Sequence, residues 1–222
     1  MKFFTTTIAT TLLAALASAS EDENVDGRKM GQTKSILAAI LGISDTDAKA
    51  LIKNYGCYCY PNNQNMVGPL STTHYNGPAV DDMDAACKAL FRSQRCLQFD
   101  IAEGTYSKAC TVEEGFSYDV DNSSGSDVFT CSTSQSACKQ AMCEMELDFA
   151  NTIAGLVNNG YAKDNQYFKM TNGEYAASCP TGLGGSGNNT PMQCCGTGLN
   201  RKTYNPLIQT CCSEVISSLG TC

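Results

Sequence analysis

The sequence predicts a mainly α protein with a small two-stranded β-wing and a small disulfide-rich C-terminal module. Three observations support this fold class. Apolar residues recur at helical spacing in residues 34–41 and 136–157. Acidic residues crowd the start of another helical segment that begins near Asp81, where the helix dipole favours negative charge. Fourteen cysteines all lie between Cys57 and Cys222, and those of the C-terminal tail are expected to hold a module that has too few apolar residues for a core.

The first 19 residues have the pattern of a cleaved signal peptide. Lys2 precedes a short apolar stretch, residues 8–17, and small residues lead up to the expected cleavage point after Ala19. That stretch is shorter than the roughly 20 apolar residues that span a bilayer, and we expect no transmembrane segment further along. An even number of cysteines in an exported chain indicates disulfides. We therefore expect a secreted, extracellular protein.

Charge and histidine content narrow the classes of partner. One of the 15 basic residues, Lys2, lies in the leader, which leaves 14 against 22 acidic residues and a net charge of about −8. This balance argues against nucleic acid as a partner and against capture by anionic membranes. The single histidine, His74, and the lack of any Cys-x-x-Cys pair argue against a zinc site. Two sequons predict glycosylation at Asn122 and Asn188.

The N-terminal third is expected to contain two short helices. After a loose polar leader, residues 20–33, the apolar stripe in residues 34–41 predicts a helix that ends near Gly42. A further helical turn is expected within residues 44–54, with Ser44 or Asp45 as its cap. Residues 60–77 are rich in Asn, Pro, Gly and Thr and are expected to form a long loop.

The middle of the chain is expected to hold two longer helices and the wing. One helix should run from residue 81 to about 95, and the longest helix should cover residues 136–157. Between them, residues 105–128 interleave aromatic and small polar residues, which predicts the two-stranded wing. The composition then becomes rich in Gly, Ser, Asn, Thr and Pro. We therefore divide the mature chain into a domain over residues 34–165 and a Cys-rich module over residues 166–222.

Three segments in order resemble the secreted phospholipase A2 family. Residues 54–59, N-Y-G-C-Y-C, resemble the start of its calcium loop. Residues 78–88, P-A-V-D-D-M-D-A-A-C-K, resemble the opening of its first long helix, and residues 130–146 resemble the start of its second. The resemblance covers roughly residues 34–160. It implies a phospholipase A2-like fold built on two long antiparallel helices that are linked by disulfides and carry a small β-wing.

The resemblance also implies a cysteine framework. It predicts disulfides Cys59–Cys87 and Cys131–Cys143. Two other bridges of the family have lost both halves, which supports the register; these positions are Ala86 with Thr152, and Ser93 with Met145. The remaining pairings stay open: Cys138 with either Cys96 or Cys110, and Cys57 with Cys179.

The residues that the family needs for catalysis are replaced. A histidine base and a calcium-binding aspartate would stand at the positions of Leu90 and Phe91. The position of the family's supporting tyrosine holds Gln94. Only Glu146 keeps an acidic group, and its side chain is one methylene longer than the family's aspartate. Residues 60–63 lack the glycines with which the family's loop carbonyls reach calcium. We therefore expect no catalytic residues, no metal site and no cofactor, although the family itself uses calcium.

Two expectations concern the space that this loss leaves. Glu146 should turn to solvent or bond a wing tyrosine such as Tyr118. The apolar faces around Leu90 and Phe91 either line a ligand pocket or close into core, and core is the commoner outcome at helical spacing. The stripe that would line the pocket comprises Ile36, Leu37 and Ile40.

The sequence leaves three alternative functions open. The first is a catalytically inactive phospholipase A2-like protein that acts as an extracellular binding or structural protein for an unknown lipid or protein. The second is an active phospholipase that hydrolyses glycerophospholipid esters at a non-standard site, for which His74 is the single histidine base. The third is an extracellular matrix component, since the tail resembles cysteine-pair repeats of such proteins; its elements are C-C-G, Tyr204-Asn205-Pro206, Gln209 and C-C.

Overall fold

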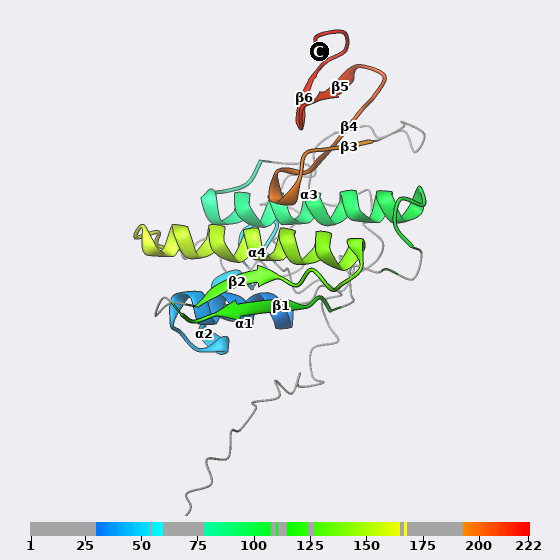
Figure 1. Ribbon diagram of the computed structural model, residues 1–222. Coiled ribbons are helices and arrows are strands. Elements are labelled where there is room, and N and C mark those ends of the chain that lie inside the picture. The colour runs from blue at the N-terminus through cyan, green and yellow to red at the C-terminus, as the bar shows by residue number, and fades with distance from the viewer. Residues whose placement is uncertain are drawn as a thin grey trace, which may run out of the picture.

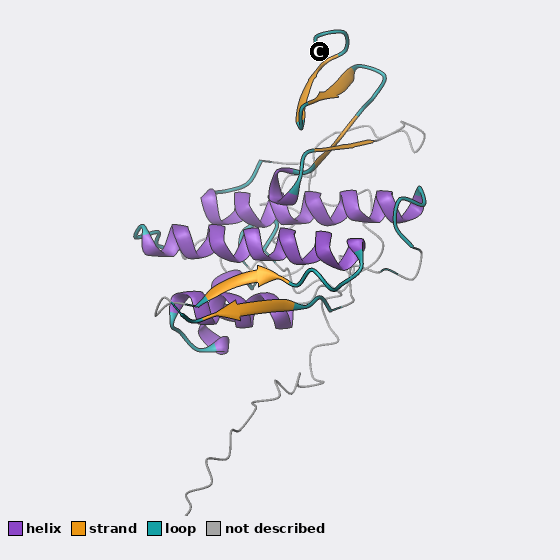
Figure 2. Ribbon diagram, in the orientation of Figure 1, coloured by secondary structure: helices purple, strands orange, loops and turns teal. Residues whose placement is uncertain are grey.

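The computed structural model contains four α-helices and three separate two-stranded antiparallel sheets in its described part (Figures 1 and 2). The described residues are 30–53, 55–59, 78–107, 110, 115–123, 127–164, 167 and 193–222. Several predictions concern residues outside them: the signal peptide, residues 20–29 of the leader, residues 60–63, His74, Cys179 and Asn188.

Three helices make up the first half of the described chain. Helix α1 spans Met30–Leu41 and so begins four residues before the expected start at residue 34. Helix α2 spans Asp45–Ile52, and the Ser44 side chain accepts a hydrogen bond from the Asp47 N–H at 3.1 Å, which confirms Ser44 as its cap. Helix α3 spans Asp82–Ala102, seven residues beyond the expected end.

A hairpin and a long helix follow. Strands β1, Tyr118–Asp121, and β2, Val128–Cys131, pair antiparallel with Tyr118 opposite Cys131. Helix α4 covers Ala137–Asn158, close to the predicted range, and the Ser136 side chain accepts from the Lys139 N–H at its start. Both of these elements arise from local signals, namely alternation in the strands and helical spacing in the helix.

The C-terminal segment consists of two further hairpins. Strands β3, Gln193–Cys195, and β4, Lys202–Tyr204, are joined through the 3₁₀ turn η3, Gly198–Asn200. Strands β5, Gln209–Cys212, and β6, Val215–Ser218, form the last hairpin. Its turn places Ser213 and Glu214 at positive φ, a conformation that suits a tight two-residue connection.

Helix α3 lies between two groups of elements (Figure 1). On one side it packs against α4, which in turn contacts α1 and β2. On its other side α3 contacts β3, β4 and η3. The β5–β6 hairpin lies at the far end of the molecule, away from the helices (Figure 1). The apolar core forms where α1, α2, α3 and α4 meet, and includes completely buried side chains such as Ile36, Leu90 and Phe149.

Six disulfides join cysteines within the described residues, and Cys57 is also disulfide-bonded. The bridges Cys59–Cys87 and Cys131–Cys143 are the two that the resemblance implied. Cys138 pairs with Cys110, whereas Cys96 pairs with Cys194 and so ties α3 to the C-terminal segment. The last two bridges, Cys195–Cys211 and Cys212–Cys222, lie within that segment. Such a density of disulfides is typical of chains that fold in an oxidising compartment.

The prediction of a mainly α fold framed by two long helices is wrong. Helices make up about 48% of the described residues, and the architecture combines four helices with small antiparallel sheets. Four of the six strands lie in residues 193–218, where the sequence shows no alternation of apolar and polar residues. Disulfides link these strands to other elements, with Cys96–Cys194 joining β3 to α3 and Cys195–Cys211 joining β3 to β5, and periodicity does not reveal such long-range links. The fold is therefore mixed.

No helix in the described ranges is both long and apolar enough to cross a lipid bilayer.

Candidate functional site

The carboxylate of Glu146 is buried between α1, α3 and α4. Its side chain lies on α4 and belongs to a residue that is only 5% exposed. The Thr33 hydroxyl donates to Oε2 at 2.6 Å, and the Gln94 amide donates to Oε1 at 2.9 Å. The expectation that Glu146 faces solvent or bonds Tyr118 is wrong, because two polar side chains from other helices meet it inside the core. Tyr118 instead packs its ring against Phe129.

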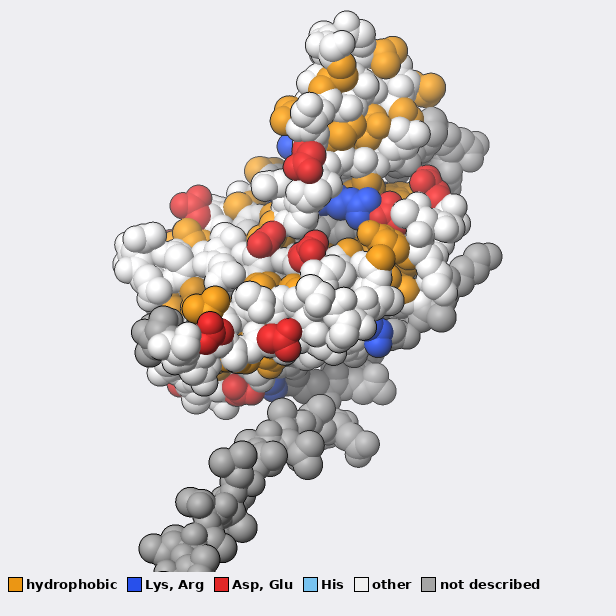
Figure 3. Space-filling model, viewed as in Figure 1, with side chains coloured by type: hydrophobic (Ala, Val, Ile, Leu, Met, Phe, Trp, Pro, Cys, Tyr) orange, Lys and Arg blue, Asp and Glu red, His pale blue; other side chains and the backbone are white. Residues whose placement is uncertain are grey.

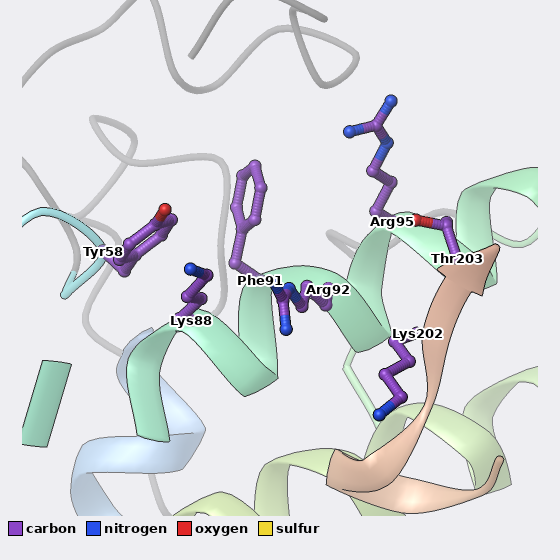
Figure 4. Close-up of a pocket in the computed structure, with 7 residues that line it drawn as sticks. All are labelled: Tyr58, Lys88, Phe91, Arg92, Arg95, Lys202 and Thr203. Atoms are coloured by element: carbon purple, nitrogen blue, oxygen red, sulfur yellow. The ribbon is translucent and has the colours of Figure 1, made fainter. Parts of the chain in front are cut away.

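The two positions assigned to a catalytic histidine and a calcium ligand hold apolar side chains in different surroundings. Leu90 is 0% exposed and packs in the core with Ile36 and Leu37. Phe91 is also buried, and its ring tilts against the Tyr58 ring with centroids 6.1 Å apart. Leu90 is thus core, whereas Phe91 forms part of the wall of a surface cavity (Figure 4). The Gln94 side chain is buried, and its amide donates a hydrogen bond to Glu146.

The chemistry of these residues does not match general base catalysis at a metal. A base must titrate near the working pH and reach the substrate, and neither Leu90 nor Phe91 can hold a proton. Calcium needs several oxygen ligands. In the part of the chain that the structure describes, no cluster of three or more His, Cys, Asp or Glu side chains is arranged to hold a metal ion.

A close backbone approach holds the segment 55–59 against α3. Gly56 has φ +57° and lies so close to the Asp84 carboxyl that any side chain at this position would collide with it. Asp84 accepts hydrogen bonds from the N–H groups of Tyr58 at 2.7 Å and Val80 at 3.0 Å. Burial raises the pKa of the Asp84 carboxyl, and these N–H donors oppose that rise. The carboxylate therefore anchors the loop and has little freedom to act on a ligand.

A cluster of tyrosines joins the start of α3 to the end of α4. The hydroxyls of Tyr55 and Tyr161 both donate to the Asp81 carboxylate, and the two hydroxyls lie 2.8 Å apart. Burial first, and then the hydrogen bond to Asp81, raises the pKa of Tyr55 to about 12. Asp81 also caps α3 by accepting from the Asp84 N–H at 2.9 Å. These contacts fasten elements together, and we assign them a structural role.

A basic cavity of about 190 Å³ lies between α3 and β4 (Figure 4). Its cations are Lys88, Arg92 and Arg95 from α3 and Lys202 from β4. We use the name basic cavity for these four residues and the space between them. Tyr58 and Phe91 form the aromatic part of the wall, and among the described residues no acidic side chain lines it. The Lys88 ammonium lies 5.0 Å from the centre of the Tyr58 ring.

Burial shifts the pKa of several groups around this cavity. Burial first, and then the nearby charge of Arg92, lowers the pKa of Lys88. Burial also lowers the pKa of Arg95. Burial raises the pKa of Tyr58 to about 12, supported by the charge of Asp84 and opposed by that of Arg92. Positive charge in the basic cavity is therefore disfavoured by its own surroundings, so an anion would be stabilised there.

A second cavity, about 500 Å³ in volume, is mostly apolar. It lies between α2 and the end of α4, with Leu41, Leu51 and Val157 among its lining residues. Lys163 lies at its edge, and burial lowers the pKa of this lysine to about 8. Its volume is within the range of small-molecule sites. This cavity is distinct from the stripe that the sequence singled out, because Ile36 and Leu37 are completely buried.

The C-terminal hairpin carries large apolar side chains that face solvent. Leu207 is 65% exposed, Ile208 64%, Val215 62% and Leu219 60%. We call these four residues the hairpin patch. Apolar side chains gather over this end of the molecule in the space-filling view (Figure 3). Larger clusters of this kind mark interaction sites on protein surfaces.

Sequence reasoning missed two features of these sites. Thr33 was assigned to a loose leader, yet it is completely buried and binds Glu146. Its spacing of three and four residues from Ile36 and Leu37 is the signal that would have placed it on the buried face of α1. The spacing of Lys88, Arg92 and Arg95 likewise predicts one face of α3, whereas the arrival of Lys202 beside them depends on the fold.

One of the two candidate glycosylation sites lies in the described chain. Asn122 is exposed and directly follows β1, at the start of the turn that leads to β2. A side chain on an exposed hairpin turn is accessible to the glycosylation machinery, so its position agrees with the sequon.

Comparison with known proteins adds no assignment to this geometry. No family model matches the chain, and a search of curated proteins finds no match.

Proposed function

We propose that this protein is secreted and acts outside the cell as a non-catalytic binding or structural protein, with an extracellular lipid or protein as its ligand. The observation that carries the proposal is the replacement of a reactive site by packing. Leu90 is buried where a base would stand, Phe91 is buried where a calcium ligand would stand, and Glu146 is engaged by Thr33 and Gln94.

The energetics favour this arrangement as a stable end state. Burial of a leucine or phenylalanine side chain stabilises a fold by about 1.5–3 kcal/mol. A buried polar group that loses its partner costs about 1–3 kcal/mol. Leu90 and Phe91 contribute the stabilisation of apolar burial and leave no polar group unpaired. Glu146 avoids the cost of an unpaired polar group through its hydrogen bonds. A site that had kept its catalytic groups would need calcium to offset them.

The motif resemblance to secreted phospholipases A2 supports the same proposal from a different direction. Its three segments agree in order along the chain, and the disulfides Cys59–Cys87 and Cys131–Cys143 are the ones it implies. The many disulfides support an extracellular location. The proposal is thus a protein of phospholipase ancestry that has exchanged catalysis for binding.

Hydrolysis of phospholipid tests the proposal directly. The mature, oxidised protein is incubated with mixed micelles in the presence of calcium, and separately with a chelator, and fatty acid release is measured. We expect no release in either condition, because the described site supplies neither base nor metal ligand. Calcium-dependent release would overturn the proposal. The variant His74→Gln would then show whether the single histidine of the chain is the base.

The hairpin patch favours a second candidate function, assembly into an extracellular matrix. A two-stranded hairpin is marginally stable alone and exposes two unpaired edges. Within the described residues no other strand pairs with the β5–β6 hairpin, and Ile208, just before β5, and Val215 of β6 face solvent. A second copy of this chain could add strands to the edges and cover the apolar side chains. In this second candidate function, the partner that covers the hairpin patch is a second copy of the chain.

Sedimentation at increasing protein concentration tests the assembly. We expect oligomers that the double variant Ile208→Ser/Val215→Ser abolishes, because serine removes the apolar area that drives association. The matched control is Val120→Ser/Val128→Ser, which removes two exposed valines from the β1–β2 hairpin instead. A monomer at every concentration, or equal loss in both variants, would contradict the assembly.

A further inference from the structure

We infer that the basic cavity between α3 and β4 is a binding site for a soluble ligand that carries phosphate or sulfate ester groups. This inference goes beyond the proposed function, since it assigns a ligand chemistry to a site that neither the motifs nor the lost catalytic positions identify. The first observation is that positive side chains are concentrated around this cavity. Four of the 15 lysines and arginines of an acidic chain surround one cavity.

The arrangement of these cations costs stability in the absence of an anion. Lys88 and Arg92 stand four residues apart on α3, and Arg92 and Arg95 stand three apart, so each pair lies on one face of the helix. Like charges at these spacings repel each other. Lys202 brings a further positive charge from β4 to the same cavity. A negatively charged ligand would turn this repulsion into attraction, and the summed field would concentrate anions from solution.

Two acidic side chains of α3, Asp84 and Asp100, have hydrogen-bond or ion-pair partners of their own. Asp84 lies one turn before Lys88, and its oxygens accept from the N–H groups of Tyr58 and Val80. Asp100, further along α3, lies 2.5 Å from the Arg201 guanidinium in an ion pair. Neither acid lines the basic cavity. The charge of Asp84 offsets part of the charge of Lys88, but the four cations of the basic cavity outnumber it, so the local field is positive although the chain as a whole has a net charge of −7.

The side chains suit a tetrahedral oxyanion better than a single carboxylate. Arginine presents several donors in a planar fork that matches phosphate and sulfate oxygens, and lysine adds a compact charge. The cations follow α3 over seven residues, which is about 10 Å along the helix. Figure 4 shows the side chains of Arg95 and Lys202 pointing in different directions rather than toward one point. A ligand with more than one ester group would reach several of them at once.

The dimensions and the surroundings favour a soluble ligand over a membrane. The basic cavity is small, about 190 Å³, so it suits one ester group of a ligand whose other ester groups reach the cations at its edge. Arg92 and Lys202 are exposed, which leaves their charged groups free to rearrange. A chain with net charge −7 is repelled by an anionic bilayer as a whole. A small anion meets only the local positive field.

Calorimetric titration of the full-length oxidised protein tests the inference. The probes are inorganic pyrophosphate, inorganic sulfate and inositol hexakisphosphate. We expect saturable binding that is strongest for the most highly charged probe and weakens as salt is added, because salt screens exposed charges. The variant Arg92→Gln/Lys202→Gln should bind about ten-fold more weakly or worse, which is the loss expected when charge-assisted hydrogen bonds are removed. Both residues are exposed, so the variant should fold, and a thermal melt checks this.

The control variant Lys34→Gln/Lys139→Gln makes the same change in net charge on α1 and α4, outside the cavity. It should bind the probes as the unmodified protein does. Equal loss in both variants would mean that binding follows net charge alone and would overturn the site. Absence of saturable binding to every probe would overturn it as well.

Vesicles distinguish the source of the anion. Phosphatidylcholine vesicles that contain phosphatidic acid are pelleted with the protein, and we expect the protein to stay in solution. Binding to these vesicles without binding to the soluble probes would overturn the inference in favour of a lipid head group. Fatty acid release is measured separately and bears only on the proposed absence of catalysis. Failure of anion binding and failure of the proposed function therefore give different readouts.

Discussion

Two of the groups that hold the buried carboxylate of Glu146 are neutral side chains from distant parts of the chain. The Thr33 hydroxyl lies 113 residues away in sequence, and the Gln94 amide lies 52 residues away. Hydrogen bonds to an ionised carboxylate are shorter and stronger than neutral ones. A single acidic residue thereby ties α1, α3 and α4 together inside the core.

The variant Glu146→Gln should lower the free energy of unfolding by about 1.5–3 kcal/mol, the usual worth of hydrogen bonds to a charged group. Glutamine keeps the size of the side chain but turns one acceptor oxygen into a donor, which then faces Thr33 or Gln94. Urea denaturation measures the change. The control Glu144→Gln removes an exposed carboxylate on the same helix and should change stability by less than about 0.5 kcal/mol. An equally small effect of Glu146→Gln would show that the buried hydrogen bonds contribute little.

At the scale of elements, α3 connects the helical core to the C-terminal hairpins. The Cys96–Cys194 disulfide joins α3 to β3. The Ser93 hydroxyl donates to the Gly198 carbonyl at 2.8 Å, and Arg201 pairs with Asp100. All three contacts lie within about two turns of α3, so one face of this helix anchors the C-terminal segment, whose turn η3 also contacts α4. Lys202 is brought to the basic cavity by the same contacts.

The double variant Cys96→Ser/Cys194→Ser should release residues 193–218 from α3. The two cysteines are 98 residues apart, and the chain-entropy model gives a stabilisation of about 4.7 kcal/mol for a loop of about 100 residues. Backbone hydrogen exchange should become faster in these hairpins and in the turns of α3 that they cover, while α1 and α4 keep their protection.

The control for this prediction is Cys212→Ser/Cys222→Ser, which opens a loop of only 10 residues at the end of the chain. Its effect on exchange should stay within β5 and β6, because a short loop restricts few conformations of the unfolded chain. If the hairpins stayed protected without Cys96–Cys194, the contacts of Ser93 and Arg201 would be sufficient to hold them.

For the whole molecule, two buried phenols make stability depend on pH in the alkaline range. Tyr55 and Tyr58 are buried, and each has its pKa raised from the ordinary value of 10.0 to about 12. Below pH 10 both phenols carry their protons in the folded and the unfolded chain. Between pH 10 and 12 the unfolded chain loses these protons while the folded chain retains them. The free energy of unfolding should therefore fall as the pH rises through this window.

Urea denaturation at a series of pH values measures this fall, and the variant Tyr58→Phe isolates the part that belongs to one phenol. Its free energy of unfolding should decline less steeply between pH 10 and 12 than that of the unmodified protein. The comparison cancels the titration of lysines, which both proteins share. Equal slopes would mean that Tyr58 titrates near its ordinary pKa and is reached by solvent.

Local signals in the sequence determined a substantial part of this protein. The spacing of apolar residues located the helices to within a few residues, except that α3 runs seven residues further than expected. The Ser44 cap follows from side-chain chemistry at a helix start. The presence of Leu90 and Phe91 where reactive residues would be needed is also visible in the chain itself. Each of these signals acts over one or two turns, which is why it can be read without a structure.

Only the tertiary structure decided the mixed fold class, the partners of Glu146 and the composition of the basic cavity. Each depends on contacts between residues that are far apart in sequence, such as Thr33 with Glu146 and Cys96 with Cys194. The short strands in residues 193–218 carry little periodicity of their own, and disulfides link them to each other and to α3. Pairing of distant residues is set by the packing of the whole chain, and no local pattern encodes which partner will be met.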